Sequence, residues 1–421
     1  MNTQRRRLVT ALSAGAGLMA IPPALRAQSA PRVVVIGGGF GGATAAKYLA
    51  LWGGDIEVVL IERSSEFVSC PISNLVLGGH RRLADVTRSY SGLTKRGVHV
   101  INDAVDAVDP AKRSVSLAGG GRLSYDRLIV SPGVDFLSDA IPGLYKAGAA
   151  DRLFHAWKAG PQTVALRAQL EALDDGGVFA LAIPKAPYRC PPGPYERACQ
   201  VASYFKLAKP RSKVLILDAN EDIVSKKALF AKAFKERYDG IIEYRPNSTV
   251  VDVDHRTNTL QLEFDTVSAD LLNVIPPQKA GRIAETAGLI TANNRWCGVH
   301  WQSMESVAQA GIHVLGDATL AAPAMPKSGH MANQHGKVCA AAVIDLLAGR
   351  AINADPLMVN TCYSFVDGRE VIHVSSVHRF DAEKKTMQAV KDSGGVSAMA
   401  SELEGQYAWS WAHNIWNDML T

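Results

Sequence analysis

The chain has 421 residues, of which 47% are hydrophobic and 20% are charged. This length predicts two or three domains with sizeable cores, and the composition excludes a disordered, collagen-like or coiled-coil protein. The formal net charge is +5, but Arg5, Arg6, Arg7 and Arg26 all lie in the first 30 residues. The rest of the chain is nearly neutral, so we expect no general attraction to nucleic acid or to acidic membranes.

The first 29 residues have the pattern of an export signal. A basic start with twin arginines precedes an uncharged run over residues 8–25, and small residues follow Arg26. This pattern is typical of a twin-arginine-type signal peptide over residues 1–29. A membrane anchor is the alternative, but Pro22 and Pro23 disfavour a spanning helix. We expect a periplasmic protein with no transmembrane segment.

A dinucleotide-binding motif follows an apolar strand predicted over residues 32–36. Gly37, Gly39 and Gly42 form G-x-G-x-x-G, with Phe40 inside it, directly before a predicted helix. Gly37 permits the tight turn, Gly39 lets the backbone approach a pyrophosphate, and Gly42 lets the helix pack closely on the strand. The helix N-terminus then faces the phosphates.

Glu62 completes this motif. It follows a predicted strand over residues 56–61 and lies 20 residues past Gly42, where a carboxylate accepts hydrogen bonds from ribose. We assign Arg63 and Val105 to the same cofactor site.

Two later strand ends predict that the dinucleotide is a flavin. Residues 128–133 enter a turn with Ser131 and Gly133, and residues 313–318 end a strand with Gly316 and Asp317. Flavoproteins with two dinucleotide-binding domains carry similar segments, in which the late aspartate binds the ribityl chain of FAD.

The middle of the chain lacks the second glycine motif that nicotinamide-dependent members of this class carry. A predicted strand over residues 178–183 is followed by residues 184–194, which contain one glycine and five prolines. The next strand, over residues 213–217, ends in Asp218 with no glycine loop before it. We therefore expect that electrons do not come from NADH or NADPH.

The sequence contains no motif for attaching a haem or for binding a metal. No C-x-x-C-H motif attaches a c-type haem, and no Cys/His cluster has zinc or iron–sulfur spacing. We expect no metal in this chain. We interpret His330, His335, His373 and His378 as structural or solvent-facing residues.

Five stretches of the chain together are more specific for one protein family than the glycine motif alone. They are V-V-V-I-G-G-G-F-G-G-A-T-A-A-K-Y at 33–48, S-C-P-I-S-N at 69–74, R-C-P-P-G-P-Y-E-R-A at 189–198, P-K-S-G-H at 326–330 and N-T-C-Y-S-F at 360–365. From about residue 30 onward the chain resembles the flavoprotein subunit of flavocytochrome c sulfide dehydrogenase, a relative of the sulfide:quinone oxidoreductases.

The resemblance implies roles for three cysteines. Cys70 would be joined by a thioether to the 8α-methyl carbon of FAD; the alternative is a buried loop cysteine. Cys190 and Cys362 would form a redox-active disulfide beside the flavin; the alternative is a structural disulfide. Cys199 and Cys339 are interpreted as core residues.

Glu196 and Lys327 each have a functional and a structural interpretation. Glu196 is a candidate general base, although a carboxylate in the first turn of a helix also complements the helix dipole. Lys327 is a candidate for stabilising the reduced flavin, although it could be a surface lysine.

The tail contains three tryptophans within residues 409–416. They could anchor the chain at a membrane interface. Residues 401–421 lack Lys and Arg, so we expect instead a helix packed over the active site.

We predict an α/β fold with two Rossmann-like, doubly wound domains and a C-terminal α+β domain. The FAD-binding domain comprises residues 30–148 and 278–352, the second nucleotide-domain-like unit residues 149–277, and the C-terminal domain residues 353–421.

The predicted function is oxidation of sulfide through Cys190, Cys362 and covalently bound FAD. Electrons would pass to a c-type cytochrome subunit in a heterodimer, and the haem would lie only on that partner. The alternatives are a sulfide:quinone oxidoreductase that reduces membrane quinone and a non-catalytic flavoprotein partner of a sulfur-oxidising complex.

Overall fold

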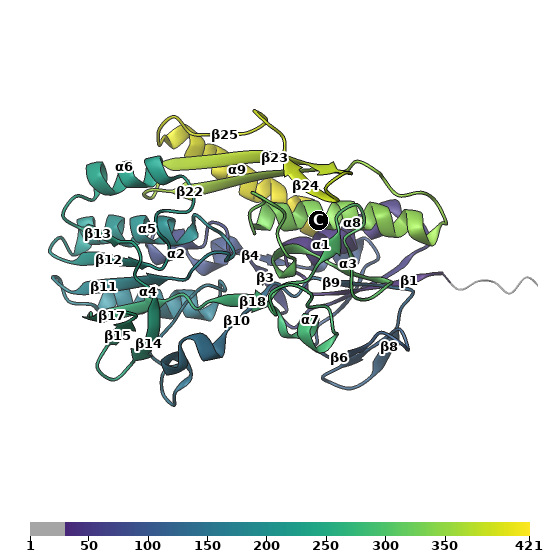
Figure 1. The fold of residues 1–421 in the computed structure, drawn as a ribbon, viewed down its shortest axis with the longest axis horizontal. Helices are drawn as coiled ribbons and strands as arrows, with labels where there is room; N and C mark the ends of the chain where they lie inside the picture. Colours follow the sequence, from purple (N-terminus) through teal and green to yellow (C-terminus); the bar gives the residue numbers. More distant parts are fainter. Residues whose placement is uncertain (1–29) are drawn as a thin grey trace, which may run out of the picture. The chain divides into compact units, whose positions relative to one another are not determined.

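The largest sheet has seven strands and is built around the first strand of the chain (Figure 1). This computed structural model describes residues 30–421; the predicted export signal lies outside the described residues. The strand order is β19-β20-β21-β9-β1-β2-β5, and β1, β2, β5, β9 and β21 run parallel. The bounds are β1 Arg32–Ile36, β2 Glu57–Ile61, β5 His99–Ile101, β9 Arg127–Val130, β19 Val299–His300, β20 Glu305–Ser306 and β21 Ile312–Val314.

Alternate residues of β1 enter two different hydrophobic cores. Val33 and Val35 join one core, while Val34 and Ile36 join the other. Because successive side chains of a strand point to opposite faces, a strand that is covered on both sides is apolar throughout. The first face is covered by α1 (Phe40–Trp52) and α8 (Gly329–Leu347). Three antiparallel strands contribute to the other core: β6 (Val105–Asp109), β7 (Ser114–Leu117) and β8 (Arg122–Ser124).

A second sheet of four parallel strands lies in the middle of the chain, in the order β13-β12-β11-β17. Its central strands are buried almost completely, and α4, α5 and α6 contribute to the core beside it. The bounds are β11 Val178–Ile183, β12 Lys213–Asp218, β13 Ile242–Arg245, β17 Leu271–Val274, α4 Pro161–Ala172, α5 Gly193–Ala208 and α6 Lys227–Arg237.

Two short strands connect the regions of the two sheets. β10 (Val134–Phe136) pairs antiparallel with β18 (Gln278–Ala280). The chain therefore passes out of and back into the first sheet region through one two-stranded ribbon. The exact domain boundaries stay predictions, since the chain from Pro31 to Thr421 packs as one unit.

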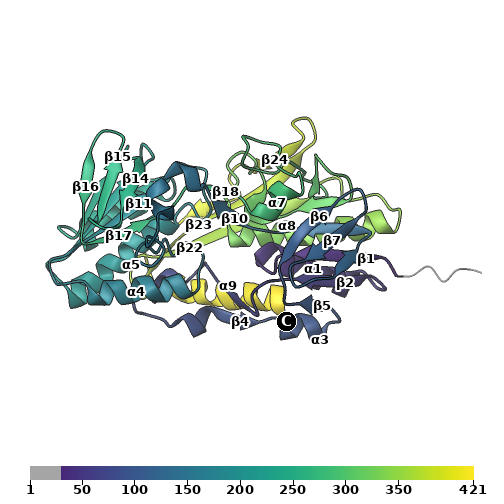
Figure 2. The same cartoon turned by 90° about the horizontal axis from the view of Figure 1, so that it is seen from below.

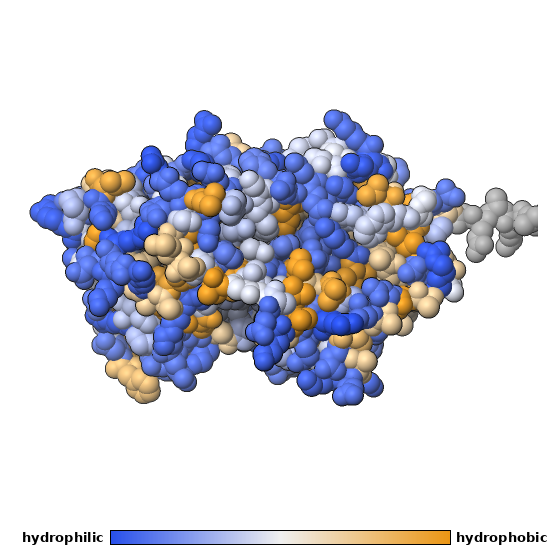
Figure 3. Space-filling view, turned by 90° about the horizontal axis from the view of Figure 1, so that it is seen from above, coloured by the Kyte–Doolittle hydropathy of each residue, from blue (hydrophilic) through white to orange (hydrophobic). Residues whose placement is uncertain are grey.

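The C-terminal part is an antiparallel sheet followed by a long helix. Strand β22 contacts both α5 and α8, so it bridges the two sheet regions (Figure 1). Figure 3 shows the surface of this side, which is mostly hydrophilic with scattered apolar residues. The bounds are β22 Leu357–Phe365, β23 Val371–Asp381, β24 Thr386–Ala389, β25 Gly395–Val396 and α9 Glu402–Leu420.

Helix α9 packs against α1 and β23 and is seen along its length in Figure 2. It begins at Ser401, whose side chain accepts a hydrogen bond from the Glu404 N–H. Near its end, Asp418 contacts Tyr48 of α1 and Lys337 of α8. The tail therefore folds onto the protein, as predicted. None of the helices described between residues 30 and 421 combines the length and apolarity needed to span a bilayer.

Candidate active site

A cavity of about 520 Å³ lies where the three parts of the chain meet. Its volume is within the range of small-molecule and cofactor sites. Of the predicted site residues, all but Gly42 line it: Gly37, Gly39, Phe40, Glu62, Arg63, Cys70, Val105, Ser131, Gly133, Cys190, Glu196, Gly316, Asp317, Lys327 and Cys362.

The glycine motif has the geometry of a phosphate-binding turn. Gly37 has a φ of 95°, which favours glycine. A Cβ on Gly42 would lie 1.9 Å from the Gly37 carbonyl oxygen, so Gly42 supports the turn from behind. A Cβ on Gly39 would have no heavy atom within 4 Å, which leaves the cavity side of the turn open to a ligand.

Glu62 lies beside this turn at the end of β2. Its Oε2 accepts the Gly38 N–H at 2.6 Å, and its Oε1 accepts the Ser64 N–H at 2.9 Å. These bonds fix the carboxylate at the cavity wall, and each oxygen retains a lone pair for a ribose hydroxyl.

Asp317 is partly buried at the end of the last parallel strand. Its Oδ1 has no hydrogen-bond partner among the described residues. Burial raises the pKa of this carboxyl, while Arg189 and Lys327 oppose that shift. A ligand hydroxyl would supply the missing donor, so the site fits the ribityl chain of FAD. Together with the open glycine turn and Glu62, these residues fit FAD as the dinucleotide.

Lys327 is buried, which excludes the surface-lysine interpretation. Its Nζ donates to the backbone oxygens of Asp317, at 2.9 Å, and of Thr319. It also lies 3.7 Å from the centroid of the Trp296 ring. Burial lowers the pKa of Lys327 to about 8. In this structure its ammonium group therefore holds the loop around Asp317, while the residue still lines the cavity.

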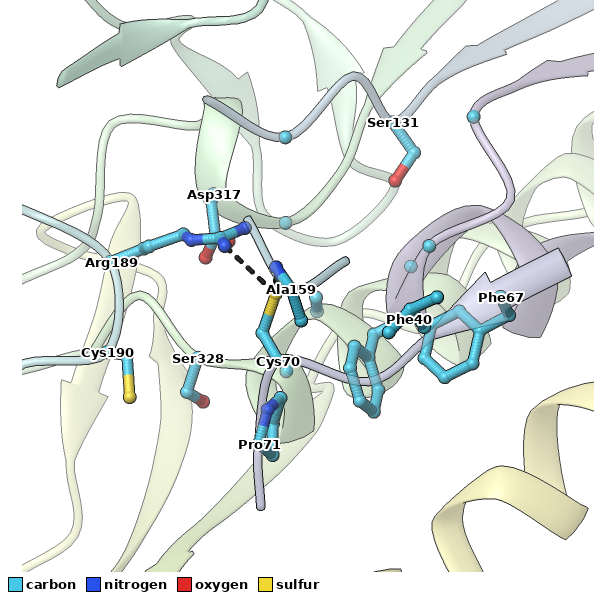
Figure 4. Close-up of a pocket in the computed structure, with 18 of the residues that line it drawn as sticks. Phe40, Phe67, Cys70, Pro71, Ser131, Ala159, Arg189, Cys190, Asp317 and Ser328 are labelled. Atoms are coloured by element: carbon cyan, nitrogen blue, oxygen red, sulfur yellow. Dashed lines mark hydrogen bonds between the residues drawn. The ribbon is translucent and has the colours of Figure 1, made fainter. Parts of the chain in front are cut away.

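Cys70 contacts two donors inside the cavity (Figure 4). The guanidinium of Arg189 donates to its sulfur at 3.0 Å, and the backbone N–H of Ala159 does so at 3.4 Å. The sulfur is thus held at the cavity wall rather than in a packed core. This position is compatible with the predicted bond to a flavin.

Cys190 and Cys362 come from distant parts of the chain and line the same cavity. Cys190 lies just before α5, and its N–H donates to the Lys327 oxygen at 2.7 Å. Cys362 lies on β22, where the Asn360 side chain donates to its sulfur at 3.4 Å. Both are free thiols in this structure, so the implied disulfide stays a prediction.

The two thiols have different electrostatic surroundings. Burial raises the pKa of Cys190, and the nearby Glu196 carboxylate raises it further. Burial also raises the pKa of Cys362, but the Lys226 ammonium and the Asn360 amide oppose this.

Glu196 joins the three parts of the protein at the cavity. Its Oε2 accepts from the Asn74 side chain at 2.9 Å, and its Oε1 accepts from the Phe365 N–H at 2.9 Å. Burial raises its pKa, although these hydrogen bonds favour the charged form. A carboxylate with a raised pKa, facing a cavity with two cysteines, is a stronger proton acceptor than an ordinary glutamate and is suited to act as a general base.

The remaining cysteines are structural. Cys199, Cys297 and Cys339 are all fully buried, and Cys199 and Cys339 lie in separate hydrophobic cores, as predicted. Among the side chains described from residue 30 onward, no cluster of His, Cys, Asp and Glu could hold a metal ion.

The acid at the end of the predicted strand over residues 213–217 already accepts hydrogen bonds from other protein groups. Asp218 is fully buried, and its Oδ2 accepts from the hydroxyls of Tyr195, at 2.7 Å, and Tyr244, at 3.0 Å. Its Oδ1 accepts from the Asn220 amide at 2.7 Å. These protein groups take the position where a nicotinamide dinucleotide would place its ribose hydroxyls, which supports the expectation that the middle of the chain binds no NADH or NADPH.

We therefore expect that NADH and NADPH do not reduce the bound flavin. The measurement is anaerobic stopped-flow absorbance of the flavin after mixing with NADH, NADPH or sulfide. Bleaching by either nicotinamide at a rate comparable to that with sulfide would contradict this prediction.

Several residues of the site were not found by sequence reasoning. Arg189 and Lys226 carry positive charges that act on the cysteines, and only the position of Arg189 beside Cys190 could have suggested it. His330 was interpreted as structural or solvent-facing but lines the cavity, where it accepts the Thr361 N–H at 3.0 Å. Trp411 of α9 also lines the cavity, and its buried indole N–H has no partner among residues 30–421.

Three parts of the chain match models of known protein families. Residues 31–171 match the pyridine nucleotide-disulphide oxidoreductase model. Residues 163–276 match the central region of the sulfide dehydrogenase [flavocytochrome c] flavoprotein chain, and residues 354–420 match the flavocytochrome c sulphide dehydrogenase flavin-binding model.

Individual relatives point in the same direction. The chain is 58% identical over 45 residues to the sulfide dehydrogenase [flavocytochrome c] flavoprotein chain of Chlorobaculum thiosulfatiphilum, a match that covers 11% of this chain and 94% of that sequence. It is 23% identical over 297 residues to the mitochondrial sulfide:quinone oxidoreductase of Mus musculus, which covers 68% of this chain and 65% of the mouse protein. The chain thus spans about two thirds of the length of that relative.

A solved structure has the same fold. The sulfide:quinone oxidoreductase of Aquifex aeolicus superposes with a TM-score of 0.75 at 19% identity, over 93% of this chain and 92% of that one. The predicted α/β class is confirmed, and fold and cavity together define a flavoprotein of the pyridine nucleotide-disulphide oxidoreductase type. Within that class, the chain belongs to the family of flavocytochrome c sulfide dehydrogenase flavoprotein chains, which is related to the sulfide:quinone oxidoreductases.

Proposed function

We propose that this chain is the flavoprotein subunit of a periplasmic sulfide dehydrogenase, that it carries FAD bound covalently to Cys70, and that it passes electrons to a c-type cytochrome subunit. The observation that carries the proposal is the meeting of Cys190, Cys362 and Glu196 in one cavity that also contains the dinucleotide-binding residues. The export signal predicted over residues 1–29 supports the periplasmic location, where a disulfide can form.

The chemistry of the site begins with a proton transfer. Glu196 accepts a proton from hydrogen sulfide, which leaves hydrosulfide as the nucleophile. In the oxidised protein, hydrosulfide attacks one sulfur of the Cys190–Cys362 disulfide. A new S–S bond forms in a cysteine persulfide, the original S–S bond breaks, and the other cysteine leaves with the electron pair as a thiolate.

The remaining residues hold the reactants and the cofactor. FAD, when bound, supplies a centre that accepts two electrons and can release them singly to a haem. The glycine turn, Glu62 and Asp317 position this dinucleotide. The Arg189 guanidinium donates to the Cys70 sulfur and interacts with the charge of Asp317, so it is placed to orient the part of the cofactor that Cys70 would hold.

A sulfide:quinone oxidoreductase is the second candidate. It is favoured by the matches over two thirds of the chain to the mouse protein and over most of the chain to the Aquifex structure. The two functions share the sulfide half-reaction and differ in the electron acceptor.

One experiment tests the proposal and separates the two candidates. The purified chain is first mixed anaerobically with sulfide, and then the reduced protein is mixed either with oxidised c-type cytochrome or with a soluble quinone. We expect sulfide to bleach the flavin and cytochrome to restore its absorbance faster than quinone. Faster reoxidation by quinone would favour the second candidate, and no bleaching by sulfide would refute both.

A further inference from the structure

A lysine that carries no role in the chemistry above is buried beside the cysteine pair. Lys226 lies just before α6, and only 8% of its surface is exposed. Its Nζ donates to the backbone oxygen of Cys362 at 3.0 Å, to the Ser364 hydroxyl at 2.8 Å and to the Ile372 oxygen at 3.3 Å. The three ammonium hydrogens are therefore used by three oxygens of β22 and β23.

All three of these partners are neutral groups. A buried ammonium that is held only by neutral oxygens retains most of the cost of losing water. The charged or titratable groups that act on it are Cys362 of β22, Cys190 and Glu196 at the start of α5, and Glu404 of α9. Burial lowers the pKa of Lys226 to about 8, and these four groups oppose the shift. The groups that can supply compensating negative charge are the Cys362 sulfur, when it is ionised, and the nearby Glu196 and Glu404 carboxyl groups.

The hydrogen bond to the Cys362 carbonyl places the Lys226 ammonium next to Cys362. Among the groups that act on Cys362, Lys226 is the strongest that favours a charged sulfur, and the Asn360 and Ser328 side chains act in the same direction. Glu196 opposes them. At Cys190 the carboxylate of Glu196 acts more strongly than either Arg189 or Lys226, which act in the opposite direction.

We propose that Lys226 is a positioning residue that holds Cys362 on β22 and supplies the positive charge that stabilises a negatively charged sulfur at this cysteine. The catalytic use of this role rests on the proposed function, because thiol–disulfide exchange proceeds through thiolates. The stabilisation itself is a property of the reduced chain and can be measured without sulfide.

The test measures the thiol of Cys362 directly. The intact FAD-containing protein is reduced, and the rate of alkylation by iodoacetamide is followed against pH by mass spectrometry of the peptide that contains Cys362. We expect Lys226→Met to shift the part of this profile below about pH 8, where the Lys226 ammonium is charged, upward by about one pH unit, because an opposite charge nearby lowers the pKa of a thiol. At a given pH in that range, alkylation then slows about tenfold.

Two further variants separate charge from structure. Lys226→Arg keeps the charge and should restore the profile at least in part. Lys227→Met removes the adjacent lysine, whose side chain is 65% exposed, and should leave the profile unchanged because solvent screens that charge. Melting curves show whether each variant is folded.

The outcomes decide the proposal. An upward shift in Lys226→Met that Lys226→Arg reverses and Lys227→Met does not reproduce supports it. An unchanged profile below about pH 8 in folded Lys226→Met overturns it. An equal shift in Lys226→Met and Lys226→Arg, with loss of melting temperature in both, shows a purely structural lysine and also overturns it. None of these results depends on whether the chain oxidises sulfide, so failure of the proposed function would be seen separately.

Discussion

Replacing either Cys190 or Cys362 with serine is expected to abolish reduction of the flavin by sulfide. Attack on a disulfide needs both sulfurs, because one takes the new S–S bond and the other leaves as thiolate. The FAD content should be retained, since the glycine turn, Glu62 and Cys70 are unchanged. The measurement is anaerobic bleaching of the flavin by sulfide at low temperature, together with a melting curve for each variant.

A purely structural disulfide makes a different prediction. Each variant would then lose stability, typically about 2–5 kcal/mol, yet still be reduced by sulfide at a temperature where it is folded. Cys199→Ser and Cys339→Ser are the controls, since both thiols lie in cores away from the cavity and should not be needed for bleaching. If either Cys190→Ser or Cys362→Ser bleaches at the wild-type rate, the catalytic assignment is wrong.

The second large effect is expected at Cys70. In the unmodified chain the yellow colour should stay with the protein after denaturation and acid precipitation, because a thioether survives both. Cys70→Ser should release its FAD into the supernatant, while the glycine turn and Asp317 still bind it before denaturation. The measurement is flavin absorbance in pellet and supernatant, with the mass of the intact chain as a second readout.

Arg189 offers a matched test of the same site. It donates to the Cys70 sulfur but is not itself a flavin attachment residue, so Arg189→Lys should retain a flavin-linked fraction that Cys70→Ser lacks completely. Cys199→Ser should keep all of its flavin in the pellet. Free FAD in the supernatant of the unmodified chain would refute the tether.

The cofactor half of the site could be predicted from the sequence because its determinants are local. A turn that needs glycine at Gly37 and Gly42, followed by a helix and then by Glu62 at the end of the next strand, is specified within about 30 residues. The apolar strands of the parallel sheet are equally local, since burial on both faces requires an uninterrupted run of apolar residues. Asp317 could be placed in the same way, by its position at a strand end.

The electrostatics of the cysteine pair were decided by the tertiary structure alone. Lys226 reaches Cys362 across 136 positions of sequence, and Glu196 accepts from Phe365 across 169. His330 and Trp411 reach the cavity only because α8 and α9 pack against it. No local pattern marks such residues, because an ammonium or carboxylate acts through distance and burial, and both exist only after the two sheets and β22 have come together.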